Sequence, residues 1–266
     1  MRMERDKCYI IRRPEHEMSV VEAGVHTALR RIGAAGRPTC VHCSLSSFGY
    51  VEGGADTLIR AFLSVESTVL VPSFSWTFSV AAPAGDRPER NGTSYDYPQC
   101  GKERAIFSTA SEEVDRDMGA FSRGVVVNAS RVRGYHPLCS FSAFGPEAAD
   151  LVRSQRPDAV WAPLERLVEV DGVVILMGVG LTRLTLAHLA EQRAGRHPFV
   201  RWARMRDGTV GRVQVGSCSD GFAKLEAGLH DVIYEQVGSS RWMVLSARRT
   251  PPIDGCHQGL TGHNQM

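Results

Sequence analysis

A histidine and a glutamate, His188 and Glu191, stand three residues apart in a largely apolar stretch. If that stretch is helical, Thr185, His188 and Glu191 lie on one face, because residues three apart are neighbours on a helix surface. An imidazole beside a carboxylate, just past the carboxyl end of a strand, is well placed to accept a proton. A core histidine hydrogen-bonded to its neighbour fits the same pattern, so this row alone leaves catalysis and packing open.

The segment 41–54 indicates a second kind of chemistry. It runs from an apolar strand into a turn rich in serine and glycine, and then into a helix. Such a connection can present backbone N–H groups to an anion. A plain strand-to-helix connection with a serine cap is an equal alternative. The segment has neither a Walker lysine nor the three-glycine fingerprint of dinucleotide-binding proteins.

Cysteines are the residues that could suggest a metal. Cys40 and Cys43, together with Cys256 and His257, have the residue types of a zinc site. The first pair falls in a predicted buried strand, however, and not on a knuckle turn. Cys139, close to His136, matches no familiar pattern of a thiol nucleophile. We therefore expect no metal.

Hydrophobic periodicity predicts the elements that must position these groups. Helices are expected over 19–33, 55–64, near 110–118, over 146–154, from Pro163, along the segment carrying His188 and over 220–230. Strands are expected over 39–43, 67–72, 172–178 and 242–245. Ser19 with Glu22 is interpreted as a capping box. Residues 199–206 and 210–215, joined by a turn, predict a β-hairpin.

The predicted fold is a single large α/β domain over residues 1–266, with a central mixed sheet flanked by helices and a hairpin appended late. Residues 81–104 are interpreted as a long loop, and long loops in compact domains are often functional. Residues 250–266 are predicted to be a loosely packed tail.

Composition excludes several classes of function. The formal net charge is only +2, too small to predict a nucleic-acid or membrane partner. No run of about 18 apolar residues predicts a membrane span. The charged N-terminal residues are followed by no apolar signal region. Seven cysteines are interpreted as free thiols, and we expect a cytoplasmic protein.

Five blocks taken in order resemble the aminoglycoside 3-N-acetyltransferase family, over about residues 10–235. They are His42–Gly49 with Gly53 and Gly54, Val71–Trp76, His136–Pro137 with Ser140 and Gly145, Gly178, and Thr185 with His188 and Glu191. The resemblance implies an enzyme that transfers an acetyl group from acetyl-CoA to an amine, usually the 3-amino group of an aminoglycoside antibiotic. It also implies an α/β fold distinct from that of the commoner acetyltransferase superfamily.

The resemblance also implies roles for individual residues. His188 becomes the general base and Glu191 the acid that orients it. Contacts to the coenzyme are expected from Ser44, Leu45, Ser46, Ser47, Phe48, Gly49 and Ser73. Contacts to the amine are expected from Trp76, His136 and Asp220, the last of which is equally well interpreted as a helix cap.

The sequence departs from the family in the region 199–215, which carries Arg201, Arg204, Arg206 and Arg212. If this surface faced the pocket it would repel a polycationic aminoglycoside. The acceptor could then be a different primary amine, such as a biosynthetic intermediate. A non-catalytic module that binds coenzyme A is a further alternative, a metal-dependent hydrolase a remote one, and a homodimer is left open.

Overall fold

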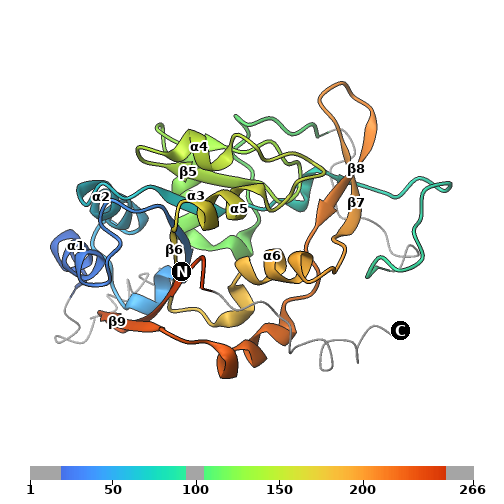
Figure 1. Ribbon diagram of the computed structural model, residues 1–266. Helices are drawn as coiled ribbons and strands as arrows, with labels where there is room; N and C mark the ends of the chain where they lie inside the picture. Colours follow the sequence, from blue (N-terminus) through green and yellow to red (C-terminus); the bar gives the residue numbers. More distant parts are fainter. Residues whose placement is uncertain (1–18, 94–104, 250–266) are drawn as a thin grey trace, which may run out of the picture.

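A seven-stranded mixed sheet forms the centre of the protein, whose computed structural model describes residues 19–93 and 105–249 (Figure 1). The strand order is β4-β5-β2-β1-β6-β10-β9. In that order the bounds are Val132–Arg133, Phe141–Phe144, Val69–Pro72, Thr39–Cys43, Val173–Met177, Ser240–Ser246 and Ile233–Val237. The three central strands β2, β1 and β6 are parallel, and the outer strands are antiparallel to their neighbours. The expected α/β class with a central mixed sheet is confirmed.

The parallel strands are buried on both faces. All five residues of β6 are buried, and β1 pairs with it in register from Thr39 opposite Val173 to Cys43 opposite Met177. Strands covered by helices on both sides read as continuous apolar runs, which is why the segment 173–177 shows no alternation with polar residues. Its alternate side chains enter two separate cores: Ile175 on one face and Leu176 on the other.

Within the described residues, helices pack against both faces of the sheet. One layer comprises α1 (Glu22–Arg31), α2 (Ala55–Ser64) and α3 (Gly119–Val127), whose apolar side chains pack in the core around Ile175. The other comprises α4 (Ala148–Val152), α5 (Ala162–Glu169) and α6 (Leu186–Arg193), which pack around Leu176. The helix that carries His188 is therefore fixed against the sheet by its buried leucines.

The predicted hairpin is confirmed as β7 (Phe199–Arg204) and β8 (Val210–Val215). Together with the short strand β3 (Ser79–Val80) it forms a second, three-stranded sheet. Figure 1 shows the hairpin projecting at the side of the molecule next to α6. Gly208, with φ +84°, takes the left-handed backbone conformation that the turn requires.

Two helix predictions were wrong in extent or type. The helix expected near 110–118 is a single 3₁₀ turn, η3 (Arg116–Met118), and the longer helix α3 follows it. Phe121 and Val125, four residues apart on one buried face, explain why the helix lies after Gly119, where β-branched residues hid it in the sequence. The helix expected over 220–230 is a 3₁₀ helix, η5 (Asp220–Gly228).

The capping box at α1 is also absent, because Val21 occupies the N-cap position and no side chain caps the helix. Glu22 instead accepts a hydrogen bond from Arg60 of α2, at 2.8 Å. Strand β9 was not expected, since Ile233 and Tyr234 are exposed on an edge strand and give no apolar pattern. Residues 94–104 of the predicted loop, and the predicted tail, lie outside the described residues.

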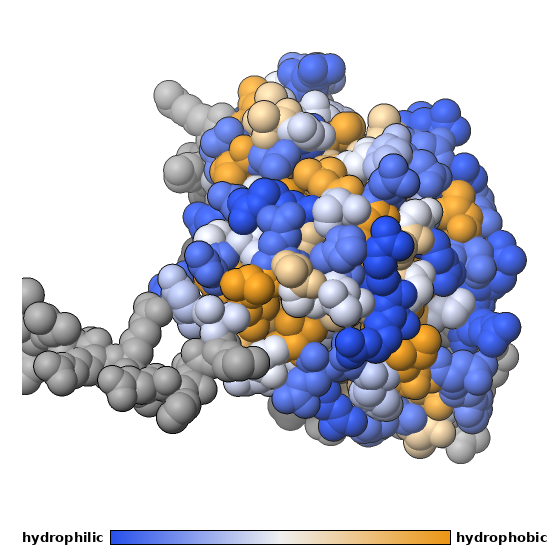
Figure 2. Space-filling view, turned by 90° about the vertical axis from the view of Figure 1, so that its left-hand side faces the viewer, coloured by the Kyte–Doolittle hydropathy of each residue, from blue (hydrophilic) through white to orange (hydrophobic). Residues whose placement is uncertain are grey.

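The face that carries α1, α2 and β9 is mainly hydrophilic, with small separate apolar patches (Figure 2). Among the described helices, none combines the length and the apolar content that a membrane crossing requires.

Candidate active site

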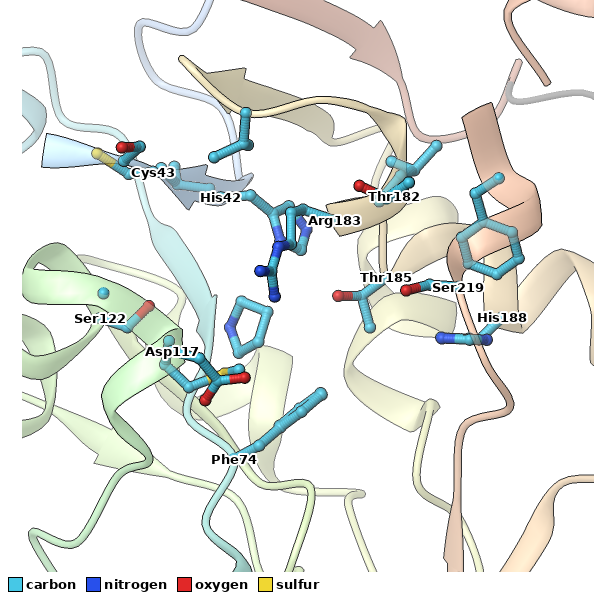
Figure 3. A pocket seen from close by; sticks show the side chains of 18 of the residues that line it. His42, Cys43, Phe74, Asp117, Ser122, Thr182, Arg183, Thr185, His188 and Ser219 are labelled. Atoms are coloured by element: carbon cyan, nitrogen blue, oxygen red, sulfur yellow. The ribbon is translucent and has the colours of Figure 1, made fainter. Parts of the chain in front are cut away.

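A cavity of about 420 Å³ opens at the carboxyl ends of the three parallel strands. Its wall is built from the segments that follow β1, β2 and β6, together with η3, the start of α3, and residues of α6 and η5. Crevices at the carboxyl ends of parallel strands are the usual position of ligands in α/β sheets. Figure 3 shows side chains from all these segments converging on it.

His188 faces this cavity from α6 and is held from behind by Glu191. Its Nδ1 lies 3.0 Å from Oε2 of Glu191, and both side chains are largely buried. The spacing of three residues on a helix places the two groups side by side, as the sequence indicated. Thr185, the third member of the row, stands at the N-cap of α6 and also lines the cavity.

The surroundings of Glu191 keep it ionised. Burial opposes ionisation, but hydrogen bonds from His188 and Ser217, with the charge of Arg196, outweigh it and hold the pKa of Glu191 below its ordinary value. The Ser217 hydroxyl donates to Oε2 at 2.8 Å, and Arg196 donates to Oε1. A carboxylate can only accept, so in the neutral tautomer of His188 that this hydrogen bond selects, Nδ1 carries the proton and Nε2 has the lone pair.

Aromatic rings fix the plane of the imidazole. Trp161 stacks on His188 with ring centroids 5.2 Å apart and an interplanar angle of 13°. Phe222 approaches the imidazole edge-on, with centroids 4.7 Å apart. Gly216 passes so close that a Cβ there would lie 3.0 Å from Nε2 of His188. The ring is therefore confined on several sides, which is how active sites hold a base in a productive geometry.

Two charged residues of opposite sign line the cavity. Asp117 enters from η3, and Arg183 enters from η4 (Leu181–Arg183), the 3₁₀ turn between β6 and α6. Arg183 lies close to His42, at the end of β1 (Figure 3). Burial first, and then the charge of Arg183, lower the pKa of His42 to about 3. His42 is therefore neutral at physiological pH, and Arg183 provides the fixed positive charge of this wall.

The serine-rich turn contributes less to the cavity than its sequence predicted. Of its six residues only Ser44 is a lining residue. Ser47 donates from its hydroxyl to the Ser44 carbonyl, and Phe48 is buried against Trp242. The amides of Ser44, Ser47 and Gly49 already donate to protein carbonyls. Leu45 is partly buried, and Ser46 and Gly49 are exposed, all outside the cavity wall.

Two more of the expected site residues lie within the core. Ser73 is fully buried, and its hydroxyl bonds to Ser140 and Ser142 across the strand pair. His136 is also fully buried: Nδ1 accepts from the amides of Leu138 and Cys139, and Nε2 donates to the Gln214 carbonyl. These positions fit a role in holding the loops in place rather than in touching an amine.

Trp76 and Asp220 are accessible. Trp76 lines the cavity with 39% of its surface exposed, and its amide donates to the carboxylate of Asp115. Asp220 is exposed at the start of η5, and its neighbours Ser219 and Phe222 are lining residues whereas Asp220 is not. Asp220 is also not the cap of η5, since Ser219 holds that position.

Sequence reasoning missed His42, Asp117, Arg183 and Phe222 as parts of this wall. The only available signal was position: His42 and Arg183 each follow or end a predicted central strand, and such strand ends meet at one edge of the sheet. Asp117 and Phe222 come from segments whose type was predicted wrongly, so no pattern could have placed them.

The basic stretch around the hairpin does not line this cavity. Arg212 forms an ion pair with Asp86, and Arg201 donates to backbone carbonyls of Asn91 and Val200. No residue from 199 to 215 belongs to the cavity wall. These arginines are therefore not placed to repel a polycation that binds in the cavity.

No zinc arrangement is present in the described part of the chain. Cys40 and Cys43 lie in β1 as free thiols, and burial raises the pKa of each to about 12. Residues 19–93 and 105–249 contain no group of three or more potential metal ligands. Cys256 and His257 fall outside the described residues. Strand β1 offers no thiolate.

The family model for aminoglycoside 3-N-acetyltransferases matches residues 40–250. The aminoglycoside N(3)-acetyltransferase IX of Micromonospora chalcea is 31% identical over 161 residues, which are 58% of this chain and 54% of that protein. The chain thus spans about half the length of the first curated relatives that it matches.

Solved structures share the fold. The aminoglycoside acetyltransferase AAC(3)-IVa, as apoenzyme, aligns with a TM-score of 0.69 and 25% identity over 89% of this chain and 87% of its own. AAC-IIIb, solved as a binary complex with CoASH, aligns with a TM-score of 0.71 and 20% identity over 88% and 94% of the two chains, which shows the fold alone. With a family match that extends over most of its sequence, the chain belongs to the aminoglycoside 3-N-acetyltransferase family.

Proposed function

We propose that the protein transfers the acetyl group of acetyl-CoA to an amine, with His188 as the general base and the 3-amino group of an aminoglycoside as the acceptor. The observation that carries this proposal is the dyad: Nδ1 of His188 is held 3.0 Å from a buried, ionised Glu191, at the wall of a cavity that reaches all three parallel strand ends. Family membership and the names of the relatives support the same reaction.

The cavity wall suits the reactive end of the coenzyme. Hydroxyl groups of Ser44, Ser122 and Thr185 line it together with apolar groups such as those of Val41 and Val179. A pantetheine arm alternates amides with methylene groups, so hydroxyls could bond its amides while the valines contact its carbons. The thioester at its end supplies an activated acetyl group. We assign Ser44 to coenzyme contact, and Trp76 to the acceptor side.

His188 accepts and then donates the proton that moves in this reaction. An ammonium ion has no lone pair, so the acceptor attacks as the neutral amine, after its extra proton has gone to solvent. As its nitrogen bonds to the acetyl carbon and the carbon–sulfur bond breaks, that nitrogen must lose one more proton. Nε2 of His188 takes that proton and can return it to the departing sulfur, because Glu191 stabilises the positively charged ring between the two transfers. Trp161 and Phe222 hold the ring in the required plane throughout.

Replacement of His188 by alanine tests the assignment. We expect His188→Ala to lower kcat by at least about a hundredfold, with little change in binding of coenzyme A, because only the proton acceptor is removed. The measurement is thiol release from acetyl-CoA in the presence of gentamicin, paired with calorimetric titration of coenzyme A.

The matched control is His230→Ala, which removes an exposed histidine outside the cavity wall. It should retain the wild-type rate. Turnover of His188→Ala close to that of this control would exclude His188 as the base.

Protection of cells is a separate consequence of the same proposal. If the 3-amino group is acetylated, expression of the protein in a susceptible bacterium should raise the inhibitory concentration of gentamicin, and His188→Ala should not. A wild-type protein that acetylates other primary amines but leaves growth on gentamicin unchanged would favour a non-antibiotic acceptor.

A further inference from the structure

Arg183 is the feature of the cavity that the proposed reaction does not use. It lies on the cavity wall, is exposed to the solvent that fills the cavity, and comes from the turn directly before α6. Within residues 19–93 and 105–249, no carboxylate pairs with it and no carbonyl accepts its protons. Arg196 and Arg133, in contrast, have such partners: Arg196 pairs with Glu191, and Arg133 donates to the carbonyl of Ser111.

The backbone holds Arg183 firmly in this position. The buried side chains of Leu181 and Leu184 anchor η4 on both sides of it. The amide of Arg183 donates to the carbonyl of Gly180 at 3.0 Å, which closes the turn. A guanidinium on an anchored turn loses less freedom on binding than one on a mobile loop, so its position suits a specific contact.

The neighbours of Arg183 leave its charge uncompensated. His42, the adjacent titratable side chain, carries no negative charge in either protonation state and so cannot act as a counter-ion. Asp117, the carboxylate that lines the same cavity, projects from η3 and forms no ion pair with Arg183 (Figure 3). Asp115, beside Asp117, uses its carboxylate to accept from the amide of Trp76. The cavity therefore has one acidic and one basic wall.

We propose that Arg183 binds an anionic group, a phosphate or a carboxylate, on a second class of acceptor, so that the site acetylates amines that carry a negative charge as well as the aminoglycoside. This inference rests on the proposed acetyl transfer and adds one class of amine to it. A guanidinium forms paired, charge-assisted hydrogen bonds with phosphate and carboxylate oxygens. A polycationic aminoglycoside, in contrast, would meet one attractive carboxylate and one repulsive guanidinium in this cavity.

The position of Arg183 relative to His188 favours the acceptor over the coenzyme as the source of the anion. Five residues separate them, and the turn between them is compact: the amides of Leu184, Ala187 and His188 each donate to a carbonyl three residues earlier. Arg183 is thus close to the reacting centre. The phosphates of the coenzyme are separated from its sulfur by the whole extended pantetheine arm, and so belong farther from His188.

A matched pair of amino sugars tests the proposal: glucosamine and glucosamine 6-phosphate, which differ only in the anion. With the wild-type protein and saturating acetyl-CoA, we expect kcat/KM for the phosphorylated sugar to be at least about tenfold higher. Arg183→Ala should abolish that preference. Arg183→Glu should reverse it and improve the rate with gentamicin, because the mutation replaces a repulsive charge by an attractive one.

Arg193→Ala is the control, since Arg193 is an exposed arginine on α6 outside the cavity wall. It should keep the wild-type ratio between the two sugars. If the ratio of kcat/KM for glucosamine 6-phosphate to kcat/KM for glucosamine is the same in the wild type and in Arg183→Ala, the proposal is overturned. A rise in KM for acetyl-CoA in Arg183→Ala that disappears with acetyl-dephospho-CoA would overturn it too, by assigning the anion to the coenzyme.

A second readout separates this inference from the proposed function. Calorimetric titration of glucosamine 6-phosphate needs no turnover, and it should show at least about tenfold weaker binding to Arg183→Ala than to the wild type. If no amine is acetylated, the proposed function fails, yet this loss of binding would still support the anion site. If gentamicin is acetylated and binding of the phosphorylated sugar is unaffected by the mutation, only the anion site fails.

Discussion

At the scale of single residues, the chemistry depends on which nitrogen of His188 carries a proton. Glu191 settles this by accepting from Nδ1, and Ser217 and Arg196 hold the carboxylate in place. Three side chains, those of Glu191, Ser217 and Arg196, thus fix the position of the lone pair on Nε2 of His188. The carboxylate acts through the imidazole and does not reach the cavity, so we regard Glu191 as a positioning residue.

Glu191→Gln tests this role. A glutamine amide that faces Nδ1 as a donor would shift the ring proton to Nε2 and remove the base. We expect kcat to fall by at least about tenfold, with KM for acetyl-CoA unchanged, in steady-state assays of thiol release.

Ser217→Ala is the comparison for this variant, because it removes one hydrogen bond to Glu191 and keeps the carboxylate. Its kcat should stay within about threefold of the wild-type value. If the two variants lose activity equally, general packing around Glu191 would explain the loss better than control of the tautomer.

At the scale of elements, the site depends on close approaches that only glycine permits. Gly178, with φ +65°, turns the chain after β6, and a Cβ there would collide with Ser47 at 1.9 Å. Gly216, after β8, passes so close to His188 and Trp161 that an added Cβ would lie 3.0 Å from the imidazole and 3.1 Å from the indole. The turn at Gly178 thus sets where η4 and α6 begin, and the segment at Gly216 limits where the ring of His188 can lie.

Gly216→Ala should therefore disturb catalysis more than folding. Its Cβ would lie 3.0 Å from Nε2 of His188 and 3.1 Å from Trp161, so the ring must shift by a few tenths of an ångström. We expect kcat to fall several-fold to about tenfold, since misplacement by about 1 Å can cost about a hundredfold. Stopped-flow or steady-state kinetics measures the rate, and thermal unfolding reports the fold.

The paired control is Gly228→Ala, where a Cβ would meet no atom within 4 Å. It should leave kcat unchanged. Full activity in Gly216→Ala would mean that the imidazole tolerates displacement and that its confinement does not matter for the rate.

At the scale of the whole molecule, two buried histidines link stability to pH. Burial, chiefly, lowers the pKa of His42 to about 3 and that of His136 to about 4. Their unfolded values are about 6.5, so between these limits the unfolded chain binds more protons. Stability from the neutral rings is therefore fully present above pH 6.5, and it declines as the pH falls toward the folded values.

We expect the free energy of unfolding, measured by urea titration, to be lower at pH 5 than at pH 7. His42→Asn should reduce this difference, because it removes one of the two groups that the fold keeps neutral. The exposed His230→Asn should not reduce it. An identical difference in all three proteins would show that other groups govern the acid sensitivity.

The amino-acid sequence alone determined the features that depend on local periodicity. The apolar run 173–177 identified a central strand, and the spacing of Thr185, His188 and Glu191 placed three polar groups on one helix face. The hairpin 199–215 followed from alternation around a glycine turn. Each of these signals lies within one element, where the geometry of helix or strand converts sequence spacing directly into direction in space.

Only the tertiary structure decided which of the chemically capable residues share a cavity. It buried His136 and Ser73, used much of the serine-rich turn for packing, and brought Arg183, Asp117 and Phe222 together from separate segments. Such outcomes depend on how β1, β2 and β6 are ordered in the sheet and on which atoms fill the space between neighbouring segments. No local repeat in the sequence encodes those long-range contacts, because they are fixed by packing among side chains that are distant along the chain.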